Sequence, residues 1–325
     1  MNYSFYLAVL ILTLPNTLLY NMEQTLTEPE NVTKYPLKGD IRQVYWINKE
    51  RAILRNESSW TLINPATGMI IRSQELKGME HIALHPHEPL FAASHHKTVS
   101  IHDIYMGNTK TKLTINRNPV IMESVFNADD LLFVLHEQSN LLTVYDYIND
   151  NHNSLHFNKN IISIASHPSK NEIALFTEKE LFLVNTENSH IEKTIAMATI
   201  PPHVYPQCKY NLDGSLITLQ HGEKIHLVDP ANNKHSIIPI PFKDYFQDCM
   251  FYPNNNTLVT ISQVHGTLHF WDVKTLKLLE TIESNIKKNS FGMLFFDEKD
   301  LIISFKNRIL RIPVPFTIFQ HVNNT

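Results

Sequence analysis

Residues Thr267 to Thr275 read TLHFWDVKT, and this stretch decides the fold. Apolar and polar side chains alternate along it as far as Trp271, and Asp272 then begins a polar turn. Such alternation is typical of a β-strand with one buried face. The strand is either an isolated element or the clearest copy of a repeat, and the rest of the chain decides between these two interpretations.

Strand-like runs that end in Asp or Asn recur along the chain. Before Asp272 they end at residues separated by 39 to 44 positions, namely Asn64, Asp103, Asp146, Asn185 and Asp229. Beyond Asp272, the run NRILRIP ends at Pro313, 41 residues further on. Seven such ends with a period near 40 residues indicate an internal repeat of the length of a propeller blade.

Each repeat shows four apolar runs separated by turn residues, which predicts four strands per unit. The seventh unit has three convincing strands, and the segment NVTKYPL, Asn31 to Leu37, is an additional strand before the first unit. We therefore predict an all-β fold, a seven-bladed β-propeller of four-stranded antiparallel blades, closed by the N-terminal strand. The units are 37–77, 78–118, 119–160, 161–201, 202–244, 245–285 and 286–316.

The repeats resemble those of the WD40-type β-propeller family over almost everything after residue 35. The most similar unit is LVTISQVHGTLHFWD, Leu258 to Asp272, and the segment Ile82 to Asp103 is also similar. The sequence departs from the family pattern because one unit alone carries the Trp-Asp pair and none carries the Gly-His dipeptide. The resemblance implies a propeller without complete Asp–His–Ser–Trp networks, and it assigns no subfamily.

The N-terminal segment differs in composition from the repeats. FYLAVLILTL, Phe5 to Leu14, is apolar throughout and has the length of the h-region of a secretory signal peptide. We predict a signal peptide or hydrophobic anchor over 1–21, a linker over 22–30, the propeller over 31–316 and a tail over 317–325. The protein is then exported, whether secreted, periplasmic or membrane-anchored. The alternative is a cytoplasmic chain that starts at Met22, or a first segment that forms a buried strand.

Two pairs of residues are interpreted as structural. Trp271 should pack between neighbouring sheets, and the Asp272 carboxylate should bind the backbone of its own turn. Cys208 and Cys249 occupy corresponding points of adjacent units. They could form a disulfide in an exported protein, but two buried thiols are favoured because strands of adjacent blades are not hydrogen-bonded to each other.

Histidines cluster in the second unit, at His81, His85, His87, His95 and His96. A metal site needs three or four ligands that converge on one point. The turns that hold these residues should lie at opposite ends of a blade, so we expect solvated turn histidines and no metal. Four Asn-X-Ser/Thr sequons occur, at Asn31, Asn56, Asn255 and Asn323, and they would matter only in a glycosylating secretory pathway.

The sequence contains no catalytic motif that we recognise, such as G-x-S-x-G, H-E-x-x-H or a phosphate-binding glycine loop. Net charge is −4 and there is no long basic block, which argues against nucleic-acid binding. We expect a monomeric, non-enzymatic scaffold without cofactors that binds a protein on one propeller face, and that meets a membrane only through an uncleaved N-terminal segment. The alternative is a channel-centred enzyme or small-ligand binder, resembling lactonase-type seven-bladed propellers, in which ionisable residues from several blades converge.

Overall fold

The structure is a computed structural model that describes residues 32–34 and most of 41–313. Within the second range it leaves out 42, 49, 57–58, 76–78, 116–119, 138, 200–206, 222, 241–245, 254–255, 263–265, 284–291, 298–299 and 306–307. The predicted signal peptide or anchor, the linker and the C-terminal tail therefore lie outside the described residues. So do the sequons at Asn31, Asn255 and Asn323.

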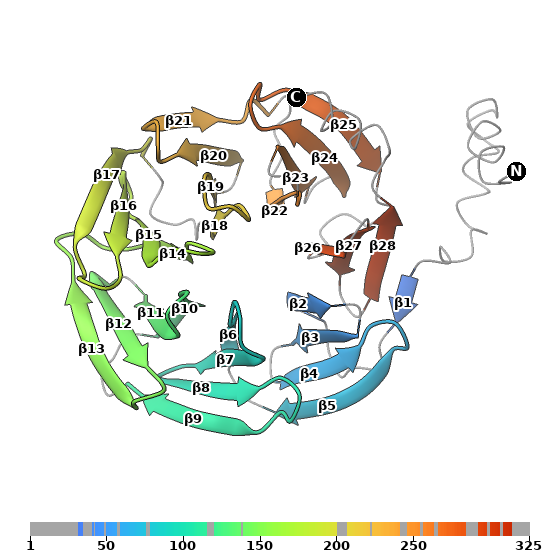
Figure 1. Cartoon of the computed structure of the whole chain (residues 1–325). Helices are drawn as coiled ribbons and strands as arrows, with labels where there is room; N and C mark the ends of the chain where they lie inside the picture. Colours follow the sequence, from blue (N-terminus) through green and yellow to red (C-terminus); the bar gives the residue numbers. More distant parts are fainter. Residues whose placement is uncertain are drawn as a thin grey trace, which may run out of the picture.

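The described strands form four-stranded antiparallel sheets arranged around a central axis (Figure 1). Six sheets each contain four strands that are consecutive in the sequence. They are β2 (Gln43–Asn48), β3 (Arg51–Arg55), β4 (Ser59–Asn64) and β5 (Met69–Glu75); β6 (Met79–Leu84), β7 (Leu90–His95), β8 (Thr98–Asp103) and β9 (Thr109–Thr114); β10 (Ile121–Phe126), β11 (Leu131–His136), β12 (Leu141–Asp146) and β13 (Asn151–His156); β14 (Ser163–Ser166), β15 (Glu172–Phe176), β16 (Glu180–Asn185) and β17 (Ile191–Ala196); β18 (Gln207–Tyr210), β19 (Ile217–His221), β20 (Lys224–Asp229) and β21 (Lys234–Ile237); and β22 (Phe246–Phe251), β23 (Thr257–Ser262), β24 (Thr267–Asp272) and β25 (Leu278–Glu283). We number these six blades in chain order.

The remaining sheet corrects the predicted ring of seven regular blades. It combines β26 (Gly292–Asp297), β27 (Asp300–Phe305) and β28 (Arg308–Pro313) with β1 (Val32–Lys34) at its edge. Of the predicted closing strand, Asn31 to Leu37, the structure describes Val32 to Lys34, and these three residues pair with β28. Six blades are thus continuous in sequence, and the remaining sheet is a composite of the two ends of the described chain.

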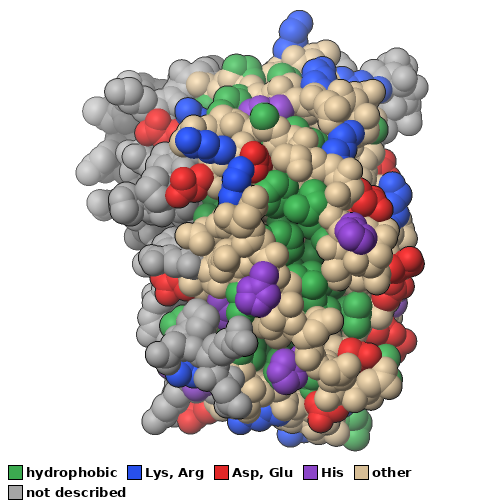
Figure 2. All heavy atoms as spheres, turned by 90° about the vertical axis from the view of Figure 1, so that its left-hand side faces the viewer, with side chains coloured by type: hydrophobic (Ala, Val, Ile, Leu, Met, Phe, Trp, Pro, Cys, Tyr) green, Lys and Arg blue, Asp and Glu red, His purple; other side chains and the backbone are tan. Residues whose placement is uncertain are grey.

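The hydrophobic core lies between neighbouring sheets. Between blades 1 and 2, for example, Trp60 packs edge-on against Phe91, with ring centroids 4.9 Å apart. The middle strands supply most of this core, and all six residues of β23 are buried. The fourth strands are mostly exposed and form the rim, as in β13. Figure 2 views this rim from the side of β13 and β17 and shows hydrophobic side chains gathered near its centre, with charged side chains around them.

Each repeated Asp or Asn caps the turn that follows its strand. Asp103 Oδ1 accepts hydrogen bonds from the backbone N–H groups of Tyr105 and Met106, both at 2.8 Å. Asp146 makes the same pair of bonds one blade further on, to Ile148 and Asn149. The period in the sequence therefore reflects a recurring local requirement, since a short side-chain acceptor must satisfy the backbone donors of each turn.

A second capping position follows the first strand of several blades. His85 Nδ1 accepts from the backbone N–H groups of His87 at 3.2 Å and Glu88 at 2.8 Å. Its Nε2 lies 2.9 Å from Asp130 Oδ1 of blade 3. Burial lowers the pKa of His85, which keeps Nδ1 available as an acceptor near neutral pH. In blade 3 the amide oxygen of Asn127 performs the same function.

This equivalence gives a stability prediction. Replacing His85 with alanine should lower the free energy of unfolding by about 1–3 kcal/mol, because two turn donors lose their acceptor. His85→Asn should recover most of the loss, since asparagine occupies the equivalent position of blade 3. Guanidinium titration of the two variants measures both values. Equal losses in both variants would show that the imidazole contributes through packing and not through capping.

Antiparallel connections place the turns of a blade on two faces. Turns from the first to the second strand and from the third to the fourth strand share one face, which we call the turn face. The other turns, and the connections between blades, share the opposite face. His85 and His87 therefore lie at the other end of the blade from His95 and His96.

Candidate functional site

Trp271 and Asp272 are structural, as predicted. Trp271 is 2% exposed, and its indole Nε1–H donates to Thr260 Oγ1 at 3.1 Å. Asp272 Oδ1 accepts from the backbone N–H of Thr275 at 2.6 Å and from its hydroxyl at 2.7 Å. The two residues stabilise blade 6, and neither lines a cavity that we describe below.

The two cysteines are free thiols, and both are buried. Burial raises the pKa of each thiol, to about 12 for Cys249 and well above its ordinary value for Cys208. The favoured interpretation, two buried thiols, is confirmed, and the alternative disulfide is absent. A thiol held in its neutral form is a poor nucleophile, so these residues act in packing.

The interpretation of the histidine cluster as solvated turn residues is wrong for two members. His85 is buried, because its ring caps a turn, and His81 lies in strand β6 and lines the central channel. His96 is exposed. In the part of the chain that the structure describes, no group of three His, Cys, Asp or Glu side chains could hold a metal ion. Asn56 is also buried, and its side chain accepts from Ser59 N at 2.7 Å, which makes that sequon unsuited to glycosylation.

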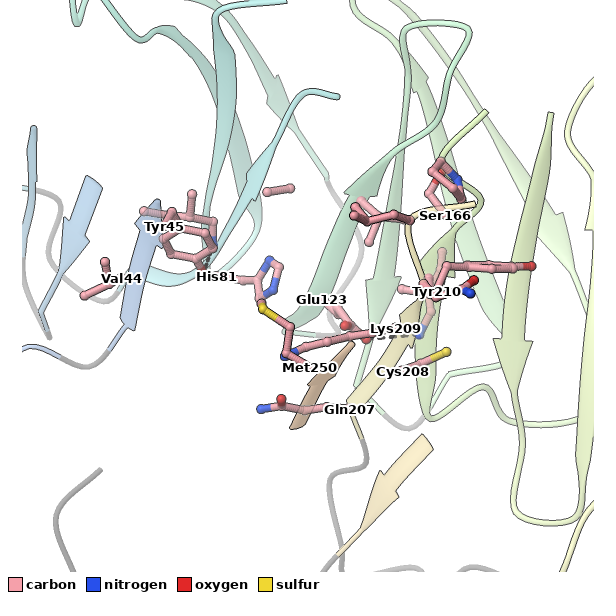
Figure 3. A pocket seen from close by; sticks show the side chains of 18 residues that line it. Val44, Tyr45, His81, Glu123, Ser166, Gln207, Cys208, Lys209, Tyr210 and Met250 are labelled. Atoms are coloured by element: carbon pink, nitrogen blue, oxygen red, sulfur yellow. Dashed lines mark hydrogen bonds between the residues drawn. The ribbon is translucent and has the colours of Figure 1, made fainter. Parts of the chain in front are cut away.

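Sequence reasoning assigned no residue to the central channel, where the first strands of six blades surround a cavity of about 410 Å³ (Figure 3). Its polar lining comes from strands far apart in sequence, with Tyr45 on β2, His81 on β6, Glu123 on β10 and Lys209 on β18. Figure 3 shows these four side chains arranged around the same space. The sequence did contain a pattern that indicates equivalent positions in blades 2 and 3, because His81 and Glu123 each stand four residues before a turn-capping residue.

Several of these side chains reach the first strand of the next blade. Tyr45 Oη accepts from the backbone N–H of Ile82 at 3.3 Å. His81 Nδ1 lies 3.4 Å from Ser124 Oγ, and burial lowers the pKa of His81 to about 4, so the ring is neutral at pH 7. These bonds tie blades 1, 2 and 3 together around the channel without using strand ladders.

Glu123 makes the corresponding hydrogen bonds between the first strands of blades 3 and 4. Its Oε2 accepts from Ser163 Oγ and from the backbone N–H of Ile164, each at 3.0 Å. Burial raises its pKa to about 7, although these hydrogen bonds and the charge of Lys209 act in the opposite direction. The carboxyl group is therefore poised to gain or lose a proton near neutral pH.

Lys209 makes an ion pair across blades 5 and 6. Its Nζ lies 2.5 Å from Asp248 Oδ1 and donates to the backbone oxygen of Cys249 at 3.1 Å. Burial is the largest single influence on the pKa of Lys209 and lowers it, but the charge and hydrogen bond of Asp248, together with smaller contributions from Cys249 and Glu123, outweigh burial and raise this pKa. The Asp248 side chain is 1% exposed, and its Oδ1 also accepts from the backbone N–H of Cys249 at 2.8 Å, so Lys209 and this N–H both stabilise the buried carboxylate.

A second candidate site lies on the turn face at blades 1 and 2. We define the β8–β9 turn patch as three exposed apolar side chains, Met69, Tyr105 and Met106, which are 60%, 57% and 67% exposed. Arg72 joins the two elements that carry them, because its Nη1 donates to the backbone oxygen of Met106. The guanidinium of Arg51 lies 5.8 Å from the centroid of the Tyr105 ring.

The patch borders a groove of about 370 Å³ between the two blades. Ile47, Leu84, Pro86, Ile104 and Tyr105 supply apolar parts of its wall. Gly107 holds the adjoining turn with φ of +63°, and a Cβ at this position would lie 2.2 Å from Arg72 Cδ. Asp150 and Leu276 hold the equivalent positions of blades 3 and 6 with positive φ, so it is the close approach of Arg72 that favours glycine here. The turn presents Tyr105 and Met106 to solvent.

No known protein-family model matches the chain, and no curated protein matches its sequence. The described strands establish a β-propeller of four-stranded blades, which is consistent with the WD40-type resemblance at the level of the fold. Among the described residues there is no helix of the length and apolar character that crossing a membrane requires.

Proposed function

We propose that the protein is a non-enzymatic interaction scaffold whose protein partner docks at the β8–β9 turn patch. The observation that carries this proposal is the exposure of three large apolar side chains beside a groove that has both polar and apolar walls. Clustered exposed apolar residues are typical of interaction surfaces, whereas scattered ones need no explanation. A propeller fold alone does not identify a function, so the proposal depends on the patch.

The chemistry of the patch indicates what it binds. Tyr and Met are enriched in protein interfaces, and the Arg51–Tyr105 contact holds the aromatic ring in place before a partner arrives. The groove accepts one apolar side chain, and the exposed Glu88 carboxylate at its wall favours a basic residue beside it. We expect a protein segment with an apolar anchor residue next to Lys or Arg.

The blade repeat offers a matched control for testing this surface. Tyr105 and Ile148 each stand two residues after a capping aspartate, and both side chains are more than half exposed. Tyr105→Ala should weaken the affinity for the partner at least about tenfold, which is about 1.4 kcal/mol. Ile148→Ala should change it by less than about twofold.

The measurement is a binding titration of the purified wild type and both variants against a partner recovered with the wild type. Thermal unfolding of each variant checks that the blades stay folded. Equal effects of Tyr105→Ala and Ile148→Ala, or no effect of either, would place the interface elsewhere and contradict the proposal.

We also propose that the protein acts outside the cytoplasm, on the basis of the apolar run Phe5 to Leu14. Cell fractionation followed by mass spectrometry of the native N-terminus tests this. A chain that begins between residues 20 and 25 in an extracytoplasmic fraction supports export. A cytosolic chain that begins at Met1 or Met22 contradicts it.

A further inference from the structure

The Glu123 carboxylate in the central channel has one occupied and one available oxygen. Oε2 accepts both hydrogen bonds from blade 4, from Ser163 and from Ile164. Oε1 receives no hydrogen bond from the described residues, although Glu123 lines the cavity. A carboxylate oxygen that faces a cavity without a donor is a binding group for a ligand that brings one.

The charges around Glu123 favour a positively charged ligand. Lys209 is the cation that acts on Glu123 among the described groups, and it is already bound to Asp248. Two carboxylates therefore share one ammonium when Glu123 is ionised. His81 is neutral near pH 7, and the charge of Arg55 acts on Tyr45 and His81. One further positive charge beside Oε1 would neutralise the net negative charge of Glu123, Asp248 and Lys209, whereas an anion would increase it.

The rest of the cavity suits the apolar body of a small molecule. Ile82, Val125, Ile164, Ala165 and Met250 contribute to its wall, and each comes from the first strand of a blade. The cavity also includes Leu212, which is 64% exposed in a turn of the turn face. A volume of about 410 Å³ lies in the range of small-ligand sites, and the exposed Leu212 marks its entrance.

We propose that the central channel binds a small organic monocation, with an ammonium group on Glu123 Oε1 and an apolar body against the aliphatic wall. The ammonium donates to the free oxygen while the ion pair of Lys209 with Asp248 stays intact. This binding is separate from docking at the β8–β9 turn patch, because it uses the first strands and not the turns between the third and fourth strands.

A pair of isosteric probes tests the charge requirement. Cyclohexylammonium and cyclohexanol have nearly the same size and differ in charge, and saturation-transfer NMR or calorimetry measures their binding to the full chain. We expect saturable binding of cyclohexylammonium and at least about tenfold weaker binding of cyclohexanol. Below pH 7 the affinity for the cation should fall, by about tenfold per pH unit well below the pKa of Glu123, because the carboxyl group must lose its proton to bind.

Glu123→Gln is the matched variant, because the amide oxygen still accepts the hydrogen bonds from Ser163 and Ile164. It should weaken cyclohexylammonium binding at least about tenfold and remove the pH dependence between pH 6 and 8. Unfolding titrations of the variant check that the fold is intact. Equal binding of both probes, unchanged binding to Glu123→Gln, tighter binding of cyclohexanecarboxylate, or no saturable binding at millimolar concentrations would each overturn the proposal. Because none of these outcomes depends on a protein partner, a failure here leaves the scaffold proposal standing.

Discussion

Replacing Trp271 with alanine is expected to lower the free energy of unfolding by about 3–5 kcal/mol. The indole is 2% exposed, so its removal leaves a cavity between blades 5 and 6 and frees the hydroxyl of Thr260. The packed sheets cannot close such a cavity without moving the adjoining strands. Guanidinium titration followed by fluorescence and circular dichroism measures the loss.

Trp271→Phe serves as the control for this substitution. Phenylalanine fills most of the space but cannot donate to Thr260, so its loss should be less than half that of alanine. A loss below about 1 kcal/mol for Trp271→Ala would contradict the placement of this side chain between the blades.

The second large effect is expected at the ion pair of the channel. Lys209→Met should destabilise the protein by about 3 kcal/mol, because the buried Asp248 carboxylate loses its cation. The Lys209 side chain is 30% exposed, so the value should lie at the lower end of the range for buried pairs.

The double variant Lys209→Met/Asp248→Leu distinguishes two contributions to the loss of stability. One is the loss of the ion pair, and the other is the cost of leaving a buried carboxylate without its cation. Replacing both partners by apolar residues should restore most of the stability of the wild type. Equal defects in the single and double variants would mean that the lysine contributes through its packing and not through its charge.

The strands could be predicted because one local requirement recurs in every blade. Asp103, Asp146 and Asp272 each cap a turn that follows an alternating strand, and this chemistry leaves a period in the sequence. The extent of the closing strand could not be predicted by the same reasoning. Pairing of β1 with β28 joins residues almost 280 positions apart, and no local pattern fixes how many residues of such a pair are in register.

The channel could not be assembled from the sequence by the same reasoning. Glu123 and Lys209 are single polar residues in separate strands, and only the ring brings them to one cavity. The role of His85 was missed because an imidazole and an asparagine amide can cap the same turn, which hides their equivalence in the sequence. The β8–β9 turn patch had a readable signal. DIYMG, Asp103 to Gly107, places two large apolar side chains together in a turn, whereas the equivalent turn of the next blade, DYIND, is capped in the same way and keeps one exposed isoleucine.

The most direct test of the scaffold proposal is site-specific photo-crosslinking in the native source cells. A photo-reactive amino acid replaces Tyr105 in one variant and Ile148 in a second, because the two positions are equivalent in neighbouring blades. We predict one specific crosslinked protein from position 105, at least about tenfold more abundant than from position 148, since a crosslink requires direct contact at the patch. The same crosslinks from both positions, or from neither while the partner still co-purifies, would contradict docking at the β8–β9 turn patch.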